Sequence, residues 1–296
     1  MANRILVTGA PGTVGTELVR LVADRGLDAR VMVHHIERSG EVAHPGLEIV
    51  EGDLADVGSM SRALSGVDTL FLCSSAAPNQ AEVQNGAIRT AVNAGVRRIV
   101  KISAYGADPR SNVPFFAWHG QTEEALKESG VSWTLIQPYL YMQTLLQNVP
   151  SILGQGAIFN CGDGSHIPFV DARDVAAAAL GILTSSGHDG EVYTLTGPAS
   201  LTWPDIAAAI GEQIGSPVAY VPVPPDGMAG ALTAAGMPDW LIRSLVALMQ
   251  FHQADAGKTT NDVKMLSGRD PRPLKEFLAN YAQAFESALP ANTLRS

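Results

Sequence analysis

The chain has 296 residues, enough for one large α/β unit or for a main domain with a smaller lobe. Hydrophobic residues make up 46% and charged residues 17%, and the net charge of −9 disfavours a nucleic-acid partner, which would need clustered Lys and Arg. No apolar run approaches the roughly 18 residues of a membrane span, and the N-terminus lacks signal-peptide features, so we expect a cytoplasmic protein with no membrane partner.

The first half of the chain alternates between strand-like and helix-like segments. Each expected strand is a short apolar run rich in branched or aromatic residues, and each expected helix has helical spacing of its apolar residues. The expected strands are residues 4–8, 29–33, 47–51, 68–73, 98–103 and 133–136. The expected helices are residues 17–25, 59–64, 83–94 and 121–128. Strands separated by helices predict an α/β fold with a doubly wound parallel sheet.

After Pro138 the pattern changes, because glycines mark loops around shorter elements. We expect further strands at residues 157–159, 167–170, 191–195 and 218–221. We expect further helices at residues 174–183 and 204–214, and a mainly helical chain from residue 222. These elements predict a smaller, mostly helical C-terminal lobe beside the main domain.

Cysteine and carboxylate spacing gives no sign of a disulfide framework or of a metal site. Cys73 and Cys161 lie outside any C-x-x-C pattern, so we expect small core residues with free thiols in a reducing compartment. Asp171 and Asp174 have few ligand-type neighbours, and Asp174 is better placed to begin a helix. We therefore expect no metal.

A glycine-rich loop joins the first expected strand to the first expected helix. Its glycines have the spacing G-x-x-G-x-x-G, which allows a tight turn and a close approach of a pyrophosphate to the backbone and the helix N-terminus. The strand before it and the helix after it are the context that supports a dinucleotide site. The expected cofactor-binding residues in this loop are Thr8, Gly9, Gly12, Thr13, Val14 and Gly15.

The loop makes the main domain a Rossmann-type domain. We assign residues 1–137 and 168–197 to this NAD(P)-binding domain. Residues 138–167 and 198–296 are assigned to a substrate-binding lobe.

The end of the second strand normally selects the dinucleotide. An acid there binds the ribose 2′-hydroxyl of NAD, whereas a base accepts the 2′-phosphate of NADP. Here His34 follows the strand and Arg38 stands a few residues later, which favours NADP(H) over NAD(H). The alternative is that His34 and His35 form only a polar loop. The other expected cofactor-binding residues are Gly52, Asp53, Leu54, Ser74, Ser75, Ser103 and Pro138.

Several motifs in combination resemble the NmrA-like atypical short-chain dehydrogenases over nearly the whole chain. They include TGAPGTVG, GDL, KISAYGAD, SGVSWTLIQP, FVDARDVAAA and the stretches at residues 193–224 and 259–285. The H-x-x-T-E motif at residues 119–123 resembles the NAD(P)H-dependent quinone, azo-dye and triphenylmethane-dye reductases. Other members usually carry Lys where His119 stands. The resemblance places His34 at the position of a phosphate-binding base, and this departure leaves NAD open as well.

The residues present restrict the chemistry. None of the six tyrosines has Lys four residues later, so the Tyr-x-x-x-Lys pair of standard short-chain dehydrogenases is absent. Hydride transfer to an electron-poor acceptor such as a quinone or azo compound mainly needs proximity and orientation. The catalytic candidates are His119, Ser103 and Tyr105. His119 could orient the nicotinamide or supply a proton, or it could only cap the helix that carries Glu123.

Aromatic residues predict where a flat substrate binds. We expect a small aromatic or quinone-like substrate, because aromatic residues follow the carboxyl ends of two strands, where ligands of this fold bind. The expected substrate contacts are Phe115, Trp118, Tyr139, Tyr141 and Met142, with Phe116 beside them. Two other functions stay open: a non-catalytic NAD(P)-binding redox sensor, and an isoflavone-type reductase, which generally carries a helical Lys that is missing here. The protein is expected to be a monomer or a homodimer.

Overall fold

The computed structural model describes residues 3–162, 166–251 and 257–286, except for the side chains of Arg38 and Glu41. The chain divides into two compact units. The first contains Met1–Pro138, Ala172–Leu195 and Asn261–Arg269. The second contains Tyr139–Asp171, Thr196–Thr260 and Asp270–Ser296. Residues 261–269, which the sequence analysis assigned to the lobe, pack within the first unit.

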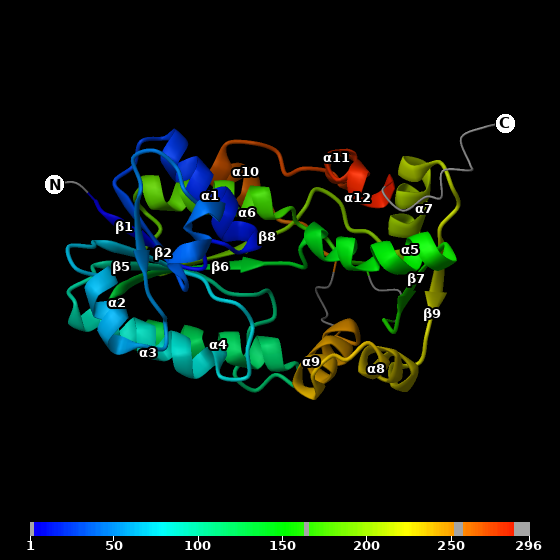
Figure 1. Cartoon of the computed structure of the whole chain (residues 1–296), viewed down its shortest axis with the longest axis horizontal. Helices are drawn as coiled ribbons and strands as arrows, with labels where there is room; N and C mark the ends of the chain where they lie inside the picture. Colours follow the sequence, from blue (N-terminus) through cyan, green and yellow to red (C-terminus); the bar gives the residue numbers. More distant parts are fainter. Residues whose placement is uncertain (1–2, 163–165, 252–256, 287–296) are drawn as a thin grey trace. The chain divides into compact units, whose positions relative to one another are not determined.

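Among the described residues, a seven-stranded parallel sheet forms the centre of the first unit (Figure 1). Its strands are β1 (Ile5–Val7), β2 (Ala29–Val33), β3 (Glu48–Glu51), β4 (Thr69–Leu72), β5 (Arg98–Ile102), β6 (Ser132–Pro138) and β8 (Glu191–Leu195). The order is β3-β2-β1-β4-β5-β6-β8, and all neighbouring strands are parallel. The doubly wound α/β fold is therefore confirmed, with β8 added as a seventh strand. The strand order reverses between β1 and β4, which is where ligands of this fold bind.

Helices cover both faces of this sheet (Figure 1). On one face, α1 (Thr13–Asp24) packs against α6 (Ala172–Thr184), and α6 packs against α10 (Asp262–Ser267). On the other face lie α2 (Val57–Ala63), α3 (Gln80–Asn93) and α4 (Pro114–Glu128). The core beneath these three helices includes Leu6, Leu70, Leu72, Ile99 and Leu135 from the strands and Met60, Ile88 and Leu126 from the helices. Because both faces are covered, successive residues of β1 and of β4 from Leu70 to Leu72 are apolar and buried.

Helix α4 begins about two turns earlier than the sequence analysis expected. Its N-cap is Val113, and Pro114 occupies the first helical position, where the missing N–H costs no hydrogen bond. Phe115 and Trp118 therefore lie in the first turns of the helix and not in a preceding loop. His119 lies inside the helix, so the alternative that it only caps the helix is wrong.

The second unit contains a small parallel sheet of β7 (Ala157–Asn160) and β9 (Ala219–Pro222). Its helical segments are η2 (Met142–Asn148), α5 (Val149–Gln155), α7 (Trp203–Ile214), α8 (Pro225–Ala234), α9 (Asp239–Met249), α11 (Leu274–Asn280) and α12 (Ala282–Glu286). The strand expected at residues 167–170 was wrong, because Ile167 and Val170 make only isolated bridges, to Leu201 and Tyr141 respectively. No helix within the described residues is both long and apolar enough to span a bilayer.

Gly181 allows α6 and α10 to pack closely, because a Cβ at this position would collide with the carbonyl oxygen of Leu266. We expect Gly181→Ala to lower the free energy of unfolding in urea by about 1–3 kcal/mol, since the two helices must separate. Gly86→Ala in α3 is the matched control, because its Cβ would meet only the Arg89 guanidinium, at 3.8 Å. The control should be neutral or stabilising by up to about 1 kcal/mol. Equal effects of the two changes would contradict the close packing.

Candidate functional site

The glycine loop between β1 and α1 forms a turn that side chains would block. Gly9 has a positive φ of 65°, and a Cβ there would lie 2.8 Å from the carbonyl oxygen of Cys73. A Cβ at Gly15 would collide with the Gly9 carbonyl oxygen, and one at Gly12 would lie 3.0 Å from the same atom. The Gly12 amide donates to this oxygen at 2.9 Å. The three glycines therefore form a tight turn, the glycine cradle, that any Cβ would obstruct.

The first turn of α1 adds hydrogen-bond donors to this cradle. The helix begins at Thr13, and no side chain caps its N-terminus. The N–H groups of a first helical turn have no intrahelical acceptors and lie at the positive end of the helix dipole. Val14 is buried, so it can offer only its backbone. The buried Thr8 accepts a hydrogen bond from the Cys73 N–H at 3.0 Å, which ties β1 to β4 beneath the loop. The arrangement fits a pyrophosphate.

The tip of β2 carries a base and, from a neighbouring loop, an acid. His34 is exposed, and its Nδ1 lies 3.9 Å from Oδ2 of Asp53, which follows β3. A Cβ at Gly52 would lie 2.7 Å from Sδ of Met32, so this glycine lets the loop pass close to β2. Leu54 packs partly against the core. Arg38 belongs to η1 (Ile36–Glu41), but its side chain lies outside the described part of the chain.

A buried lysine lies at the carboxyl end of β5. Lys101 is 0% exposed, donates to the Ile102 carbonyl oxygen at 3.1 Å, and has its Nζ 3.0 Å from Nδ1 of His119 on α4. Nε2 of Gln80, on α3, lies 3.3 Å from Nε2 and 3.5 Å from Nδ1 of His119. Three elements therefore converge on one half-buried imidazole.

Burial changes the proton affinity of these groups. It lowers the pKa of Lys101 to about 7, although the charges of Glu123 and Cys73 act in the opposite direction. Burial also lowers the pKa of His119 well below its ordinary value, and the Lys101 charge lowers it further. Burial raises the pKa of Cys73 to about 11, against the effect of Lys101. At neutral pH His119 is therefore uncharged, and Lys101 is divided between its two forms.

Glu123 forms a second buried polar centre on α4. Its Oε1 accepts hydrogen bonds from Ser103 Oγ at 2.5 Å and from Gln137 Nε2 at 2.8 Å. Lys127 Nζ lies 3.3 Å from Oε2. Because the Ser103 proton is committed to this carboxylate, Ser103 ties β5 to α4 and does not donate to a ligand in this arrangement. Glu123 lies in the interior of α4, more than two turns after its start at Pro114.

The remaining expected residues of the first unit lie at the carboxyl ends of the central strands. Ser74 accepts a hydrogen bond from Gln84 Nε2 at 2.7 Å, and Ser75 beside it is exposed. The backbone N–H of Tyr105 donates to the Pro138 carbonyl oxygen at 3.0 Å, which joins the ends of β5 and β6.

Aromatic candidates occur in both units. The Phe115 and Trp118 rings make an edge contact at 5.7 Å on α4. In the second unit, Tyr139 and Tyr141 are half-buried. Met142 is only 1% exposed and packs in the core of that unit, so we remove it from the proposed substrate contacts.

The sequence analysis missed Lys101 and Gln80. Lys101 is a charged residue inside an otherwise apolar central strand, and side chains alternate between the faces of a strand. It therefore shares a face with Ile99, which lies in the core, and with Ser103. A lysine on the core-facing side of a strand could therefore have been predicted to be a buried, functional amine. Gln80 carried no comparable signal, because its position depends on where α3 begins.

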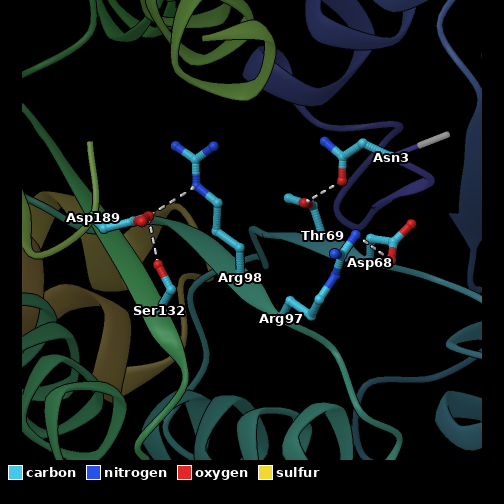
Figure 2. Close-up of a pocket in the computed structure, with 7 residues that line it drawn as sticks. All are labelled: Asn3, Asp68, Thr69, Arg97, Arg98, Ser132 and Asp189. Carbon is cyan, nitrogen blue, oxygen red and sulfur yellow. Dashed lines mark hydrogen bonds and ion pairs between the residues drawn. The ribbon is translucent and has the colours of Figure 1, made fainter. Parts of the chain in front are cut away.

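A hollow at the amino ends of the strands is lined mostly by polar and charged residues (Figure 2). It is lined by Asn3, Asp68, Thr69, Arg97, Arg98, Ser132 and Asp189. Figure 2 shows its two arginines directed at aspartates, with N–O distances of 2.6 Å for Arg97 to Asp68 and 3.7 Å for Arg98 to Asp189. Since ligands of this fold bind at the carboxyl ends of the strands, the hollow is not part of the candidate site.

The chain is similar to known proteins over nearly its whole length. The model of the NmrA-like family matches residues 1–278. An NAD(P)H azoreductase from Xenophilus azovorans is 34% identical, over 96% of this chain and 100% of the relative. The structure of an NADPH-dependent quinone oxidoreductase from Escherichia coli, complexed with NADPH, is similar at 26% identity and a TM-score of 0.84, over 94% of this chain and 99% of that one.

A regulatory protein shares the fold. The structure of NmrA, a negative transcriptional regulator in complex with NAD, has 20% identity and a TM-score of 0.77, over 97% of this chain and 95% of that one. At this identity the likeness shows the fold alone. The azoreductase and the quinone oxidoreductase are the more similar proteins, so the comparisons support an enzyme better than a redox sensor.

Lys101→Met should stabilise the protein most at low and neutral pH. The pKa of Lys101 is about 7 in the folded chain and 10.5 ordinarily, so the unfolded chain binds more protons between these values and stability rises with pH across them. Below pH 7 the full cost of burying the ammonium remains, and Met removes it. Urea unfolding should show a gain of roughly 5 kcal/mol at most near pH 6, shrinking toward pH 10. A gain or loss that does not vary with pH would contradict the buried amine.

Proposed function

This chain belongs to the NmrA-like family, and we propose that it is an NAD(P)H-dependent reductase acting on electron-poor acceptors such as quinones or azo compounds. The observation that carries the proposal is the neutral His119, which contacts Lys101 and Gln80. It lies at the carboxyl ends of the sheet strands, where the glycine cradle also lies. The cradle follows β1, and Lys101 is the second-last residue of β5, two strands away in the sheet. The names of the similar azoreductase and quinone oxidoreductase support the same acceptor class.

The residues of the first unit divide the work of binding. When bound, NAD(P)H supplies the hydride. The loop glycines and the backbone of Thr13 would hold its pyrophosphate, and Ser74 and Ser75 would contact the nicotinamide ribose. Pro138 joins the end of β5 to the end of β6 through Tyr105 and closes the site there.

His119 holds the proton that the reduced acceptor needs. A quinone that accepts a hydride becomes an anion, and a proton must then reach its oxygen. His119 is uncharged at neutral pH, so one ring nitrogen carries a proton and the other accepts one. Tyr105 orients the acceptor, and Ser103 is a positioning residue that acts through Glu123.

Aromatic side chains provide the proposed contacts to a flat acceptor. Phe115 and Trp118 present their rings from the first turns of α4. Aromatic faces stack well against planar conjugated molecules.

For the cofactor we propose NADP(H) over NAD(H). The exposed His34 at the tip of β2 is the base available to a 2′-phosphate, and Arg38 follows four residues later in the sequence. Asp53 lies close to His34 and is the acid available to a 2′-hydroxyl. The pair therefore allows NADH as a weaker cofactor.

The reductase proposal predicts that the protein oxidises NADPH only when a quinone or azo acceptor is present. His119→Gln should lower kcat by about 100-fold or more, because Gln cannot transfer a proton, while the NADPH dissociation constant stays the same. Absorbance at 340 nm and a parallel binding titration measure the two quantities. Tight dinucleotide binding without oxidation by any acceptor would contradict the proposal and favour the redox sensor.

The cofactor proposal predicts that His34→Asp reverses the preference. The new carboxylate repels a 2′-phosphate and accepts the ribose 2′-hydroxyl, so the ratio of NADPH to NADH affinity should fall by about tenfold or more. His35→Asp is the matched control, because it makes the same charge change at the neighbouring exposed residue. An equal shift in both variants would show that net charge, and not His34 itself, sets the ratio.

A further inference from the structure

Lys101 lies where a charged group is costly. Its strand, β5, pairs with β4 on one side and β6 on the other, and the side chain is 0% exposed. Taking an ammonium out of water destabilises a protein unless polar partners compensate. Nζ donates a hydrogen bond to the Ile102 carbonyl oxygen and lies within hydrogen-bond distance of His119 Nδ1. Through the second contact, the amine on β5 reaches the imidazole of His119 on α4.

The contact with Lys101 decides which nitrogen of His119 carries the proton. An ammonium has no lone pair, so protonated Lys101 must donate to Nδ1, and the His119 proton then lies on Nε2. The two distances from Gln80, 3.3 and 3.5 Å, are longer than a typical hydrogen bond of roughly 2.7–3.2 Å. Gln80 Nε2 can only donate, so it makes no hydrogen bond to a protonated Nε2, and the shorter Lys101 contact sets the tautomer.

We propose that Lys101 and His119 form a proton relay, in which Lys101 supplies protons through His119 to the reduced acceptor. This inference rests on the proposed reductase function. Lys101 does not touch the substrate in this scheme; it is a positioning and proton-supplying residue behind His119.

The relay balances atom by atom. The acceptor takes a hydride from the bound reduced nicotinamide and becomes an anion on oxygen or nitrogen. That anion takes the proton from His119 Nε2, and Nδ1 takes a proton from Lys101 Nζ as the Nζ–H bond breaks. Lys101 is left as a neutral amine, and His119 stays neutral throughout. Return of the Nδ1 proton to Nζ and uptake of one solvent proton at Nε2 restore the starting state.

A neutral His119 can donate a proton only if a second group, here Lys101, gives one to its other nitrogen. Losing a proton from a neutral imidazole gives an imidazolate, which is far too basic at neutral pH, so Nδ1 must gain a proton in the same event. The Lys101 ammonium supplies it from a position that water does not reach. Its lowered pKa of about 7 suits proton transfer near neutral pH.

Among the groups that face one another around Lys101, the Lys101 amine is the one that changes protonation near neutral pH. From α4, His119 is kept neutral by its lowered pKa, and the Glu123 carboxylate is held by Ser103, Gln137 and Lys127. From the end of β4, the raised pKa of Cys73 keeps it a thiol. Gln80 from α3 has no charge. Proton delivery should therefore decline as the pH rises past the pKa of Lys101.

Two acceptors separate proton delivery from hydride transfer. A benzoquinone needs a hydride and a proton, whereas crystal violet, a triphenylmethane cation, becomes a neutral product with a hydride alone. In single turnovers with NADPH-saturated wild-type protein, the benzoquinone rate should fall about tenfold per pH unit above a break near pH 7. The crystal violet rate should stay flat over the same range. This comparison needs no variant.

The second part of the test compares the same two acceptors in the Lys101→Met variant. Benzoquinone reduction should fall about 100-fold and lose its pH break, while crystal violet reduction stays within about threefold of wild type. Lys275→Met, the same change at an exposed position of α11, should leave both rates unchanged. Equal losses with both acceptors in Lys101→Met, or matching pH profiles in the wild type, would overturn the relay. Bound NADPH that reduces neither acceptor in the wild type would instead overturn the reductase proposal.

Discussion

The contact between Lys101 Nζ and His119 Nδ1 is the constraint on which the proposed chemistry depends. The central strand β5 carries the amine into the interior, and α4 brings the imidazole to it. Gly120, directly after His119, allows this, because a Cβ there would collide with the backbone of Asp108 and Pro109 in the loop between β5 and α4. The strand β5, the helix α4 and the loop between them therefore together fix the position of His119 Nδ1.

Stability and function make opposite demands on this part of the sheet. An apolar residue at position 101 would suit the core beneath α3 and α4, yet the chain buries an amine whose pKa is lowered by that burial. The hydrogen bonds of Glu123 to Ser103 and Gln137 hold α4 against β5 and β6, so the helix keeps its place beside a destabilising group. Proteins commonly give up stability at functional sites in this way.

The sequence was sufficient for the parts of the structure that depend on local pattern. The apolar runs located every strand of the large sheet, and the spacing of Gly9, Gly12 and Gly15 predicted a turn that the structure shows to exclude side chains. It was insufficient where tertiary contacts decide. The aromatic residues before His119 obscured the start of α4, and the burial of Lys101 depends on two helices that the strand's own sequence does not specify. The alternating residues 167–170 resembled a strand but found only single bridging partners.

The proposed reductase chemistry requires that the acceptor take its hydride directly from a nicotinamide bound in one orientation. The most direct test uses NADPH deuterated at either the 4R or the 4S position, with benzoquinone as acceptor, and measures the deuterium left in the NADP⁺ product by mass spectrometry. Because a bound nicotinamide presents one face only, one label should be lost completely and the other retained completely. Partial retention of both labels, or no oxidation of bound NADPH, would contradict the account.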